Sequence, residues 1–334
     1  CFQVGNSLHK ICRDPFRLCT ISSLFPLMIM KKIIAIVGPT GIGKSNLAVR
    51  ISQKINAEVI SADSRQVYRY MDIGTAKTSK EERDSVPHHL IDIIEPDGSY
   101  SLAEYQKQCC NAIDDISDRK RIPLLVGGSG QYVWSVVEGW CIPKVIPDIE
   151  YRQMLESKAA EIGKEQLYRE LLLTDPEAAA RIDESNVRRV IRALEIANNA
   201  KDNKRRQRDK KPIYDALIIG LTTSRQELYR RIDKRVDSMI EKGLLDETGW
   251  LINNGYDSDL PSMSGIGYKQ MVMYIKGELS LDSAIQRIKY ETHRYVRSQY
   301  NWFKLNDERI KWFDVQNDIE SDIINAIDNY MFID

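Results

Sequence analysis

The chain has 334 residues, 43% of them hydrophobic, which suits one large or two modest domains with a buried core. Its 48 Lys and Arg residues balance 48 Asp and Glu residues, so a nucleic-acid surface would have to come from local clusters of charge. The six cysteines lack the paired spacing of a zinc site, and the adjacent Cys109 and Cys110 do not suit a disulfide framework. We therefore expect reduced thiols in a cytoplasmic protein.

The first 29 residues superficially resemble a signal sequence, because Lys10, Arg13 and Arg17 precede the apolar run "ISSLFPLMIM". No small-residue cleavage site follows, and Pro26 interrupts a run that is too short to span a bilayer. We interpret residues 1–29 as a dispensable extension with the natural start near Met28 or Met30, and we expect no membrane association.

Residues 30–144 alternate strand and helix patterns. The apolar run "KKIIAIV" predicts a strand, and "SNLAVRISQKI" has helical spacing. Further strands are predicted at "AEVISADS", "LIDII" and "RIPLLVGG", with a helix at "LAEYQKQCCNAIDDISD". This alternation predicts an α/β fold, with a parallel sheet covered by helices on both faces.

The composition changes after Pro143 and Pro147, because residues 148–200 have helical periodicity and no strand-like run. Strand character returns at "YDALIIGLTT", followed by predicted helices at 224–253 and 281–303 and a weak strand at 309–315. We expect four parts: the extension, the first part of the core at 30–144, an inserted helical domain at 145–212, and the completion of the core at 213–334.

The motif "GPTGIGKS" matches the phosphate-loop pattern G-x-x-x-x-G-K-S and lies between a predicted strand and a predicted helix. In such a loop, successive backbone N–H groups converge on an anion at a helix N-terminus, the lysine adds positive charge and the serine hydroxyl can bind Mg²⁺. The predicted phosphate-binding residues are Gly38, Pro39, Thr40, Gly41, Ile42, Gly43, Lys44 and Ser45, with Ser45 as the metal ligand.

An NTP hydrolase would also need an apolar strand that ends in an acidic residue. The best candidate strand, "IPLLVGGSG", ends in glycines and Ser129 instead, which disfavours a motor or a switch. An acidic residue, Asp63, follows the second predicted strand, at the edge where ligands of open α/β sheets gather. It could hold the metal shell, act as a general base, or only cap the strand end by accepting hydrogen bonds from loop amides.

Six segments, "GPTGIGKS", "ISADSRQVYRYMDIGTAK", "PHHLIDI", "PLLVGGSGQYV", "RRVIRALEI" and "GIGYKQM", together resemble the tRNA dimethylallyltransferase family. The resemblance covers roughly residues 31 to 315. It implies a P-loop core with an inserted helical domain, and transfer of a dimethylallyl group to the N6 amine of adenosine 37 in the tRNA anticodon loop. The phosphate loop would then hold dimethylallyl diphosphate, with Mg²⁺, rather than ATP.

The resemblance also implies residue roles. Asp63 would accept the proton of the amine, Ser129 would bond the bridging oxygen of the donor, and Lys44 and Arg231 would bind the diphosphate. From the residues alone, Ser129 could be only a helix N-cap, and Arg231 with Arg235 could be only a solvated basic face.

Arg188, Arg189 and Arg192 recur at helical spacing, and the basic run from Lys201 to Lys211 follows them. Such a run is usually solvated, but the resemblance favours contact with the anticodon stem-loop. We expect a monomer whose partners are tRNA and dimethylallyl diphosphate. The predicted tRNA-binding residues are Asp63, Ser64, Arg65, Gln66, Ser129, Arg152, Arg188, Arg189, Val190, Ile191 and Arg192.

Other features have plainer interpretations. His88 and His89 have no third ligand nearby and are expected to be structural, while Trp302 and Phe303 end an amphipathic helix and are expected in the core. Three other functions stay open: a small-molecule kinase that uses Asp63 to deprotonate a hydroxyl, an adenylate prenyltransferase that makes free cytokinin, and a nucleotide-dependent RNA-binding switch.

Overall fold

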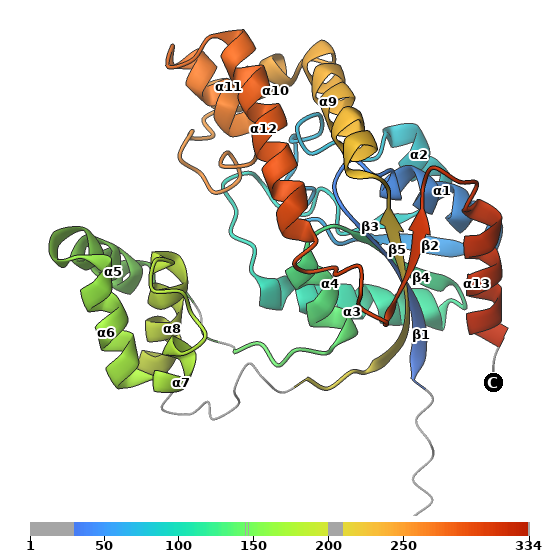
Figure 1. The fold of residues 1–334 in the computed structure, drawn as a ribbon, viewed down its shortest axis with the longest axis horizontal. Helices are drawn as coiled ribbons and strands as arrows, with labels where there is room; N and C mark the ends of the chain where they lie inside the picture. Colours follow the sequence, from blue (N-terminus) through green and yellow to red (C-terminus); the bar gives the residue numbers. More distant parts are fainter. Residues whose placement is uncertain (1–29, 144, 146, 200–209, 333–334) are drawn as a thin grey trace, which may run out of the picture. The chain divides into compact units, whose positions relative to one another are not determined.

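The computed structural model describes residues 30–143, 145, 147–199 and 210–332 (Figure 1). Six strands form one sheet in the order β3-β2-β4-β1-β5-β6, and every neighbouring pair is parallel. The predicted α/β fold is confirmed. The strands are β1 (Lys31–Val37), β2 (Ala57–Ser61), β3 (His88–His89), β4 (Ile122–Gly127), β5 (Tyr214–Thr222) and β6 (Ile310–Asp314).

Two hydrophobic cores cover the two faces of the sheet, because successive side chains of a strand point to opposite faces. In β1, Ile34 and Ile36 belong to one core, and Ile33, Ala35 and Val37 belong to the other. The first core is completed by α1 (Lys44–Ile55), α9 (Arg225–Glu241), α10 (Leu244–Asn253), α11 (Tyr268–Ile275), α12 (Leu281–Gln299) and α13 (Glu320–Phe332), and the second by α3 (Leu102–Asp118) and α4 (Gly130–Val137).

Between α4 and β5 in the chain, the described residues contain four helices and no named strand. They enclose a third hydrophobic core of their own, which includes Leu155, Leu171 and Leu194. A separate core is what an inserted helical domain requires, although its limits at 145 and 212 stay a prediction. These helices are α5 (Ile149–Ile162), α6 (Lys164–Thr174), α7 (Pro176–Ala179) and α8 (Val187–Asn199).

The predicted strand "LIDII" is wrong. The strand that pairs with β2 is His88–His89 instead, and the chain then turns, because Leu90 and Asp92 have φ angles of 62° and 56°. Both values lie in the left-handed region, which no strand adopts. Asp92 is held there by ion pairs with Lys77 and Arg83. Both histidines have partners within the protein: His88 Nδ1 lies 2.7 Å from the Val86 carbonyl oxygen, and His89 Nε2 lies 2.7 Å from the buried carboxylate of Glu58.

The helix predicted at 224–253 is in fact two helices, α9 and α10, because Gly243 between them has a φ of 96°. Helix α12 ends at Gln299, four residues before the predicted end. Phe303 lies in the core, as predicted, and packs near Trp134.

The helix predicted from "LAEYQKQCCNAIDDISD" is confirmed, and Ser101 and Glu104 form a capping box at its start. A short helix, α2 (Lys80–Ser85), lies between β2 and β3 in the chain. In the described part of the chain, no helix is both long and apolar enough to cross a bilayer. The predicted extension at 1–29 and most of the basic run after Lys201 lie outside the described residues.

Candidate active site

Three predicted site segments follow three strands that are neighbours in the sheet. The phosphate loop follows β1, Asp63 follows β2, and Ser129 follows β4, and β4 lies between the other two strands. Because the strands are parallel, all three segments leave the sheet at the same edge. The topology therefore brings the predicted phosphate loop, carboxylate and hydroxyl together.

The phosphate loop depends on backbone conformations that favour glycine. Gly38 has a φ of 145°, and a Cβ atom at this position would lie 2.6 Å from the carbonyl oxygen of Leu221. The loop then enters α1, whose N-terminal amides point toward the loop. Lys44 Nζ donates to the carbonyl oxygens of Gly38 and Pro39, both at 2.9 Å, so its charge lies over the loop.

Lys44, Asp63 and Arg235 form an electrostatic group. Burial lowers the pKa of Lys44 to about 7; the Asp63 carboxylate opposes this shift, and the Arg235 guanidinium adds to it. Burial also lowers the pKa of Arg235, again opposed by Asp63. When both are protonated, these two partly buried basic side chains beside one carboxylate carry excess positive charge, which an anionic ligand would neutralise.

Asp63 is held by its own loop, because its Oδ1 accepts a hydrogen bond of 2.8 Å from the backbone N–H of Arg65. This is the contact expected if Asp63 caps the end of β2 by accepting hydrogen bonds from loop amides. Its second carboxylate oxygen has no hydrogen-bond partner among the described residues. One oxygen thus fixes the loop, and the other is left without a partner in this part of the structure.

Ser129 stands at the N-cap position of α4, but its side chain does not cap the helix. The hydroxyl instead accepts a hydrogen bond of 3.1 Å from the backbone N–H of Ser64 and contacts the Ser64 hydroxyl at 3.4 Å. The N-cap interpretation therefore does not account for the hydroxyl, which links the end of β4 to the loop that carries Asp63.

Arg65 and Gln66, both predicted to contact tRNA, have partners within the protein. The Arg65 guanidinium donates to the Pro261 carbonyl at 2.7 Å and contacts Ser264 Oγ at 3.4 Å. Gln66 is buried and accepts a hydrogen bond from Ser61 Oγ. These contacts hold the loop after β2 in place, while contact of either residue with RNA stays a prediction.

Arg231 reaches the phosphate loop. Its guanidinium pairs with Glu227 at 2.7 Å and contacts the carbonyl oxygen of Ile42 at 3.3 Å. One turn later, Arg235 faces the same side of α9, and the two arginines line a cavity of about 630 Å³. The basic residues that line this cavity are Lys77, Arg230, Arg231, Lys234, Arg235 and Lys242, against a single carboxylate, Asp72.

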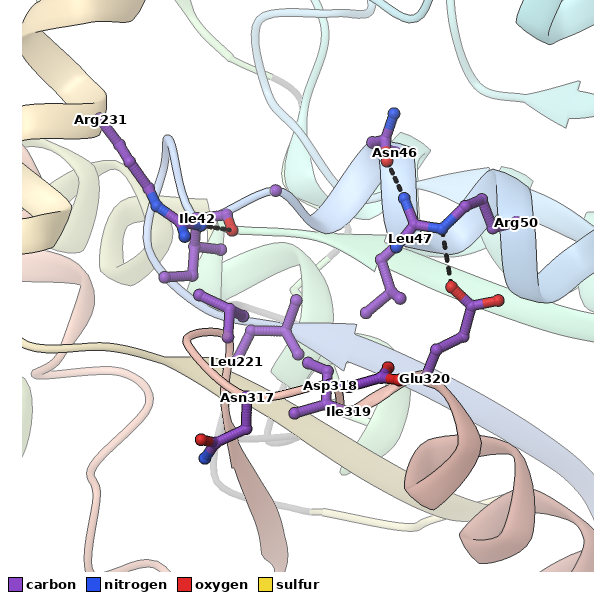
Figure 2. Close-up of a pocket in the computed structure, with 12 residues that line it drawn as sticks. Ile42, Asn46, Leu47, Arg50, Leu221, Arg231, Asn317, Asp318, Ile319 and Glu320 are labelled. Carbon is purple, nitrogen blue, oxygen red and sulfur yellow. Dashed lines mark hydrogen bonds and ion pairs between the residues drawn. The ribbon is translucent and has the colours of Figure 1, made fainter.

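A second cavity, of about 330 Å³, lies beside the phosphate loop and is shown in Figure 2. Ile42 and Leu47 line it together with Leu221 from β5 and residues that follow β6. Figure 2 shows Arg231 directed toward Ile42 on one side, and Arg50 between Asn46 and Glu320 on the other. Arg231 thus borders both cavities beside the phosphate loop.

The arginines of α5 and α8 that were predicted to bind tRNA fall into two groups. Arg152 and Arg192 both pair with Glu195, whose side chain is fully buried, and Arg152 Nη2 lies 2.7 Å from the Glu195 carboxylate. Arg188 and Arg189 are exposed and have no side-chain partner among the described residues.

Two predicted tRNA-binding residues, Val190 and Ile191, are buried in the third core and cannot offer side chains to a partner on the surface. Among the described residues of α8, Arg188 and Arg189 are therefore the arginines that are free to bind phosphate. Contact of the whole predicted set with RNA stays a prediction.

Two tyrosines near Asp63 were not identified from the sequence. Tyr295 is 39% exposed, but desolvation of its hydroxyl and the Asp63 charge raise its pKa to about 12, while a hydrogen bond with Ser129 opposes the shift. Burial raises the pKa of Tyr132 as well, with a contribution from Asp63. Tyr295 lies on α12, and no sequence motif indicated that this helix contributes to the site. Arg235 could have been assigned to the site from the sequence, because it stands four residues after Arg231, on the same face of a predicted helix.

The oxygen groups near the loop fit a magnesium ion. The Ser45 hydroxyl, at the start of α1, has no hydrogen-bond partner among the described residues, and Asp63 lies at the same edge of the sheet. Mg²⁺ prefers oxygen ligands and usually takes one or two from the protein and the others from phosphate and water. The described residues contain no cluster of three or more His, Cys, Asp or Glu side chains that could hold a metal.

The model of the family described as IPP transferase matches residues 66–306. A tRNA dimethylallyltransferase from Dehalococcoides mccartyi is 45% identical over 90% of this chain and 92% of its own length. Among solved structures, the tRNA isopentenylpyrophosphate transferase of Bacillus halodurans has a TM-score of 0.66 at 42% identity, covering 90% of this chain and 95% of its own. A eukaryotic dimethylallyltransferase acting on tRNA has a TM-score of 0.74 at 29% identity, and the match covers 90% of this chain and 79% of that protein's chain. With this extent of similarity, the chain belongs to the IPP transferase family.

Proposed function

We propose that this protein transfers a dimethylallyl group from dimethylallyl diphosphate to the N6 amine of adenosine 37 in the tRNA anticodon loop and releases diphosphate. The observation that carries the proposal is the meeting of the phosphate loop, Asp63 and Ser129 at one edge of the sheet. Family membership and the names of the relatives support the same reaction.

The acceptor needs a base, because the lone pair of an adenine N6 amine is delocalised into the ring. The nitrogen attacks the allylic carbon, the carbon–oxygen bond to the diphosphate breaks, and the amine loses one proton. The partner-free oxygen of Asp63 is our candidate for accepting that proton. Its other oxygen stays bonded to the Arg65 amide, which fixes the direction of the carboxylate.

The donor needs charge neutralisation, because negative charge accumulates on the diphosphate as the bond breaks. The loop amides and Lys44 are placed to bind it, and Arg231 and Arg235 border the same loop. The basic cavity beside α9 supports approach of the donor from that side. Ser129 would bond the bridging oxygen, at the point where charge develops first.

Mg²⁺ is part of the proposal. The Ser45 hydroxyl would hold it, and Asp63, at the same edge of the sheet, would act through its water shell. When bound, the ion would offset charge on the diphosphate oxygens. A monomer in the cytoplasm also stays a prediction, which sedimentation and cell fractionation would check.

One experiment distinguishes this function from its alternatives. The purified protein is incubated with labelled dimethylallyl diphosphate, Mg²⁺ and either unmodified tRNA or AMP. We expect label on tRNA at adenosine 37 and none on AMP. Label on AMP alone would indicate the free-cytokinin enzyme, and label on neither acceptor would contradict prenyl transfer.

A further inference from the structure

Gln299, the last residue of α12, lies between two loops of the site although it is 259 residues away from the phosphate loop. Its side chain is 3% exposed, and a polar group buried to this degree is normally kept for its hydrogen bonds. Its amide oxygen contacts the phosphate loop, and its amide nitrogen contacts the loop after β4 and, more weakly at 3.5 Å, the Thr40 hydroxyl. These contacts are made to residues of motifs described above, whereas Gln299 itself belongs to none of them.

The two hydrogen bonds run in opposite directions. Gln299 Oε1 accepts from the backbone N–H of Thr40 at 2.8 Å, and Gln299 Nε2 donates to the carbonyl oxygen of Gly128 at 3.0 Å. Thr40 belongs to the phosphate loop, and Gly128 immediately precedes Ser129. Because the acceptor is bonded to an N–H and the donor to a C=O, a flipped amide would lose both bonds.

The fit at Gly128 is tight. A Cβ atom at this position would lie 2.4 Å from Gln299 Nε2 and 3.2 Å from the carbonyl oxygen of Gly38. The glycine is therefore packed between the amide and the phosphate loop. A change at Gln299 would alter the spacing between the group that binds the diphosphate and the Ser129 hydroxyl.

We propose that Gln299 is a positioning residue that sets the distance between the phosphate loop and the Ser129 turn. The inference rests on the proposed prenyl transfer, in which the diphosphate must meet both segments at once. It goes further by giving α12 a role in the reaction. Since a displacement of about 1 Å at a reacting centre can cost a hundredfold in rate, loss of this amide should slow transfer strongly.

The first test replaces Gln299 by Met, which has similar length and cannot make either hydrogen bond. We expect single-turnover transfer to fall by about 10- to 100-fold, with the Michaelis constant for tRNA within about twofold of wild type. The control is Thr292→Val, because Thr292 is buried on the same helix and bonds only the Ile288 carbonyl in its own helix. A wild-type rate in Gln299→Met would overturn the proposal.

The second test uses Gln299→Glu, whose hydrogen-bonding ability depends on pH. A protonated carboxyl can donate to Gly128 and accept from Thr40, whereas a carboxylate cannot donate. Relative to wild type at the same pH, Gln299→Glu should transfer faster at about pH 5.5 than at about pH 8, while Gln299→Met should show no such change. Equal pH profiles for the two variants would contradict the proposal. If Gln299→Met does not fold, the comparison of Gln299→Glu with wild type decides, and equal pH profiles for these two proteins would contradict the proposal.

A separate readout distinguishes failure of this inference from failure of the proposed function. Binding of inorganic diphosphate is measured by calorimetry for wild type, Gln299→Met and Thr292→Val. If wild type does not transfer the prenyl group, the proposed function fails. In that case, diphosphate binding that is weaker in Gln299→Met but not in Thr292→Val would still support a phosphate loop held by Gln299. Equal diphosphate binding in all three proteins would overturn the inference about Gln299 as well.

Discussion

At the carboxyl edge of β2, β4 and β1, polar side chains are held by backbone groups of neighbouring loops, whereas on α8 the arginines divide between a buried carboxylate and solvent. At the edge, each contact leaves part of the side chain able to act, as in Asp63. On α8, the contact made by Arg192 stabilises the third core instead.

The two regions differ in what is lost when a polar side chain is removed, reaction rate in one and stability in the other. Removing Asp63 takes away one loop contact and the base of the proposed reaction. Removing Arg192 leaves the fully buried carboxylate of Glu195 with one partner fewer, and a buried charge without its partners is strongly destabilising. The two regions should therefore respond differently to substitution, the first in rate and the second in stability.

The largest effect is expected at Asp63. Asp63→Asn keeps an oxygen that can accept from the Arg65 amide but removes the base, so transfer should fall by about a hundredfold or more. Diphosphate binding and the melting temperature should stay near wild type. Single-turnover assays and calorimetry measure these quantities. A wild-type transfer rate in Asp63→Asn would show that Asp63 is not the base and only caps the end of β2.

The next effect is expected at Arg192. Arg192→Ala should lower the free energy of unfolding of the helical segment by about 1–3 kcal/mol, because Glu195 loses a charged hydrogen-bond partner. Urea denaturation followed by circular dichroism measures this. Arg188→Ala is the matched control on the same helix, and equal stability of the two variants would show that the ion pair contributes nothing.

Lys44 should make donor binding depend on pH. Its pKa of about 7 in the folded protein is below the ordinary value of 10.5, so above pH 7 the side chain is mostly neutral and must take up a proton to bind a diphosphate as a cation. Affinity should fall by up to about tenfold per pH unit above 7. Calorimetry at pH 8 in two buffers of different ionisation enthalpy measures the proton uptake.

The same shift sets the sign of a stability effect. Between pH 7 and 10.5 the unfolded chain binds a proton at Lys44 that the folded chain does not, so this group makes stability rise with pH in that window. Lys44→Met should remove both the rise and the proton uptake. Proton uptake that persists in Lys44→Met would assign it to another group.

The smallest effect is expected at the exposed arginines. Arg188→Ala combined with Arg189→Ala should raise the Michaelis constant for tRNA several-fold and reduce its salt dependence by about 0.7 to 0.9 per lost phosphate contact. Stability and diphosphate affinity should not change, since neither side chain has a partner among the described residues. An unchanged salt slope would place the RNA surface elsewhere.

Much of the fold was predictable because its signals are local. The helical pattern of "LAEYQKQCCNAIDDISD" predicted α3, and the glycine loop between β1 and α1 marked the phosphate site. The strand predicted at 90–94 failed because Asp92 is held in a left-handed conformation by ion pairs with two distant residues. Such tertiary contacts leave no local pattern.

The site divides in the same way. Asp63 and Ser129 could be predicted because they follow buried strands, and parallel strands end at one edge. Glu195 lies three residues after Arg192, so their ion pair could be predicted from helical spacing. The full burial of Glu195, which makes loss of the ion pair destabilising, could not be predicted in this way. Gln299 and Tyr295 had no signal, because their contacts depend on how α12 packs over the sheet.

The central claim is that the phosphate loop binds the leaving group of a prenyl donor, and the most direct test counts both products. Labelled dimethylallyl diphosphate, ATP, Mg²⁺ and unmodified tRNA are supplied together, and diphosphate, inorganic phosphate and labelled tRNA are measured over time. We predict one diphosphate released for each dimethylallyl group on tRNA and no phosphate from ATP. Steady release of phosphate from ATP that is lost in Ser45→Ala, without labelled tRNA, would contradict the account and favour the kinase or the switch.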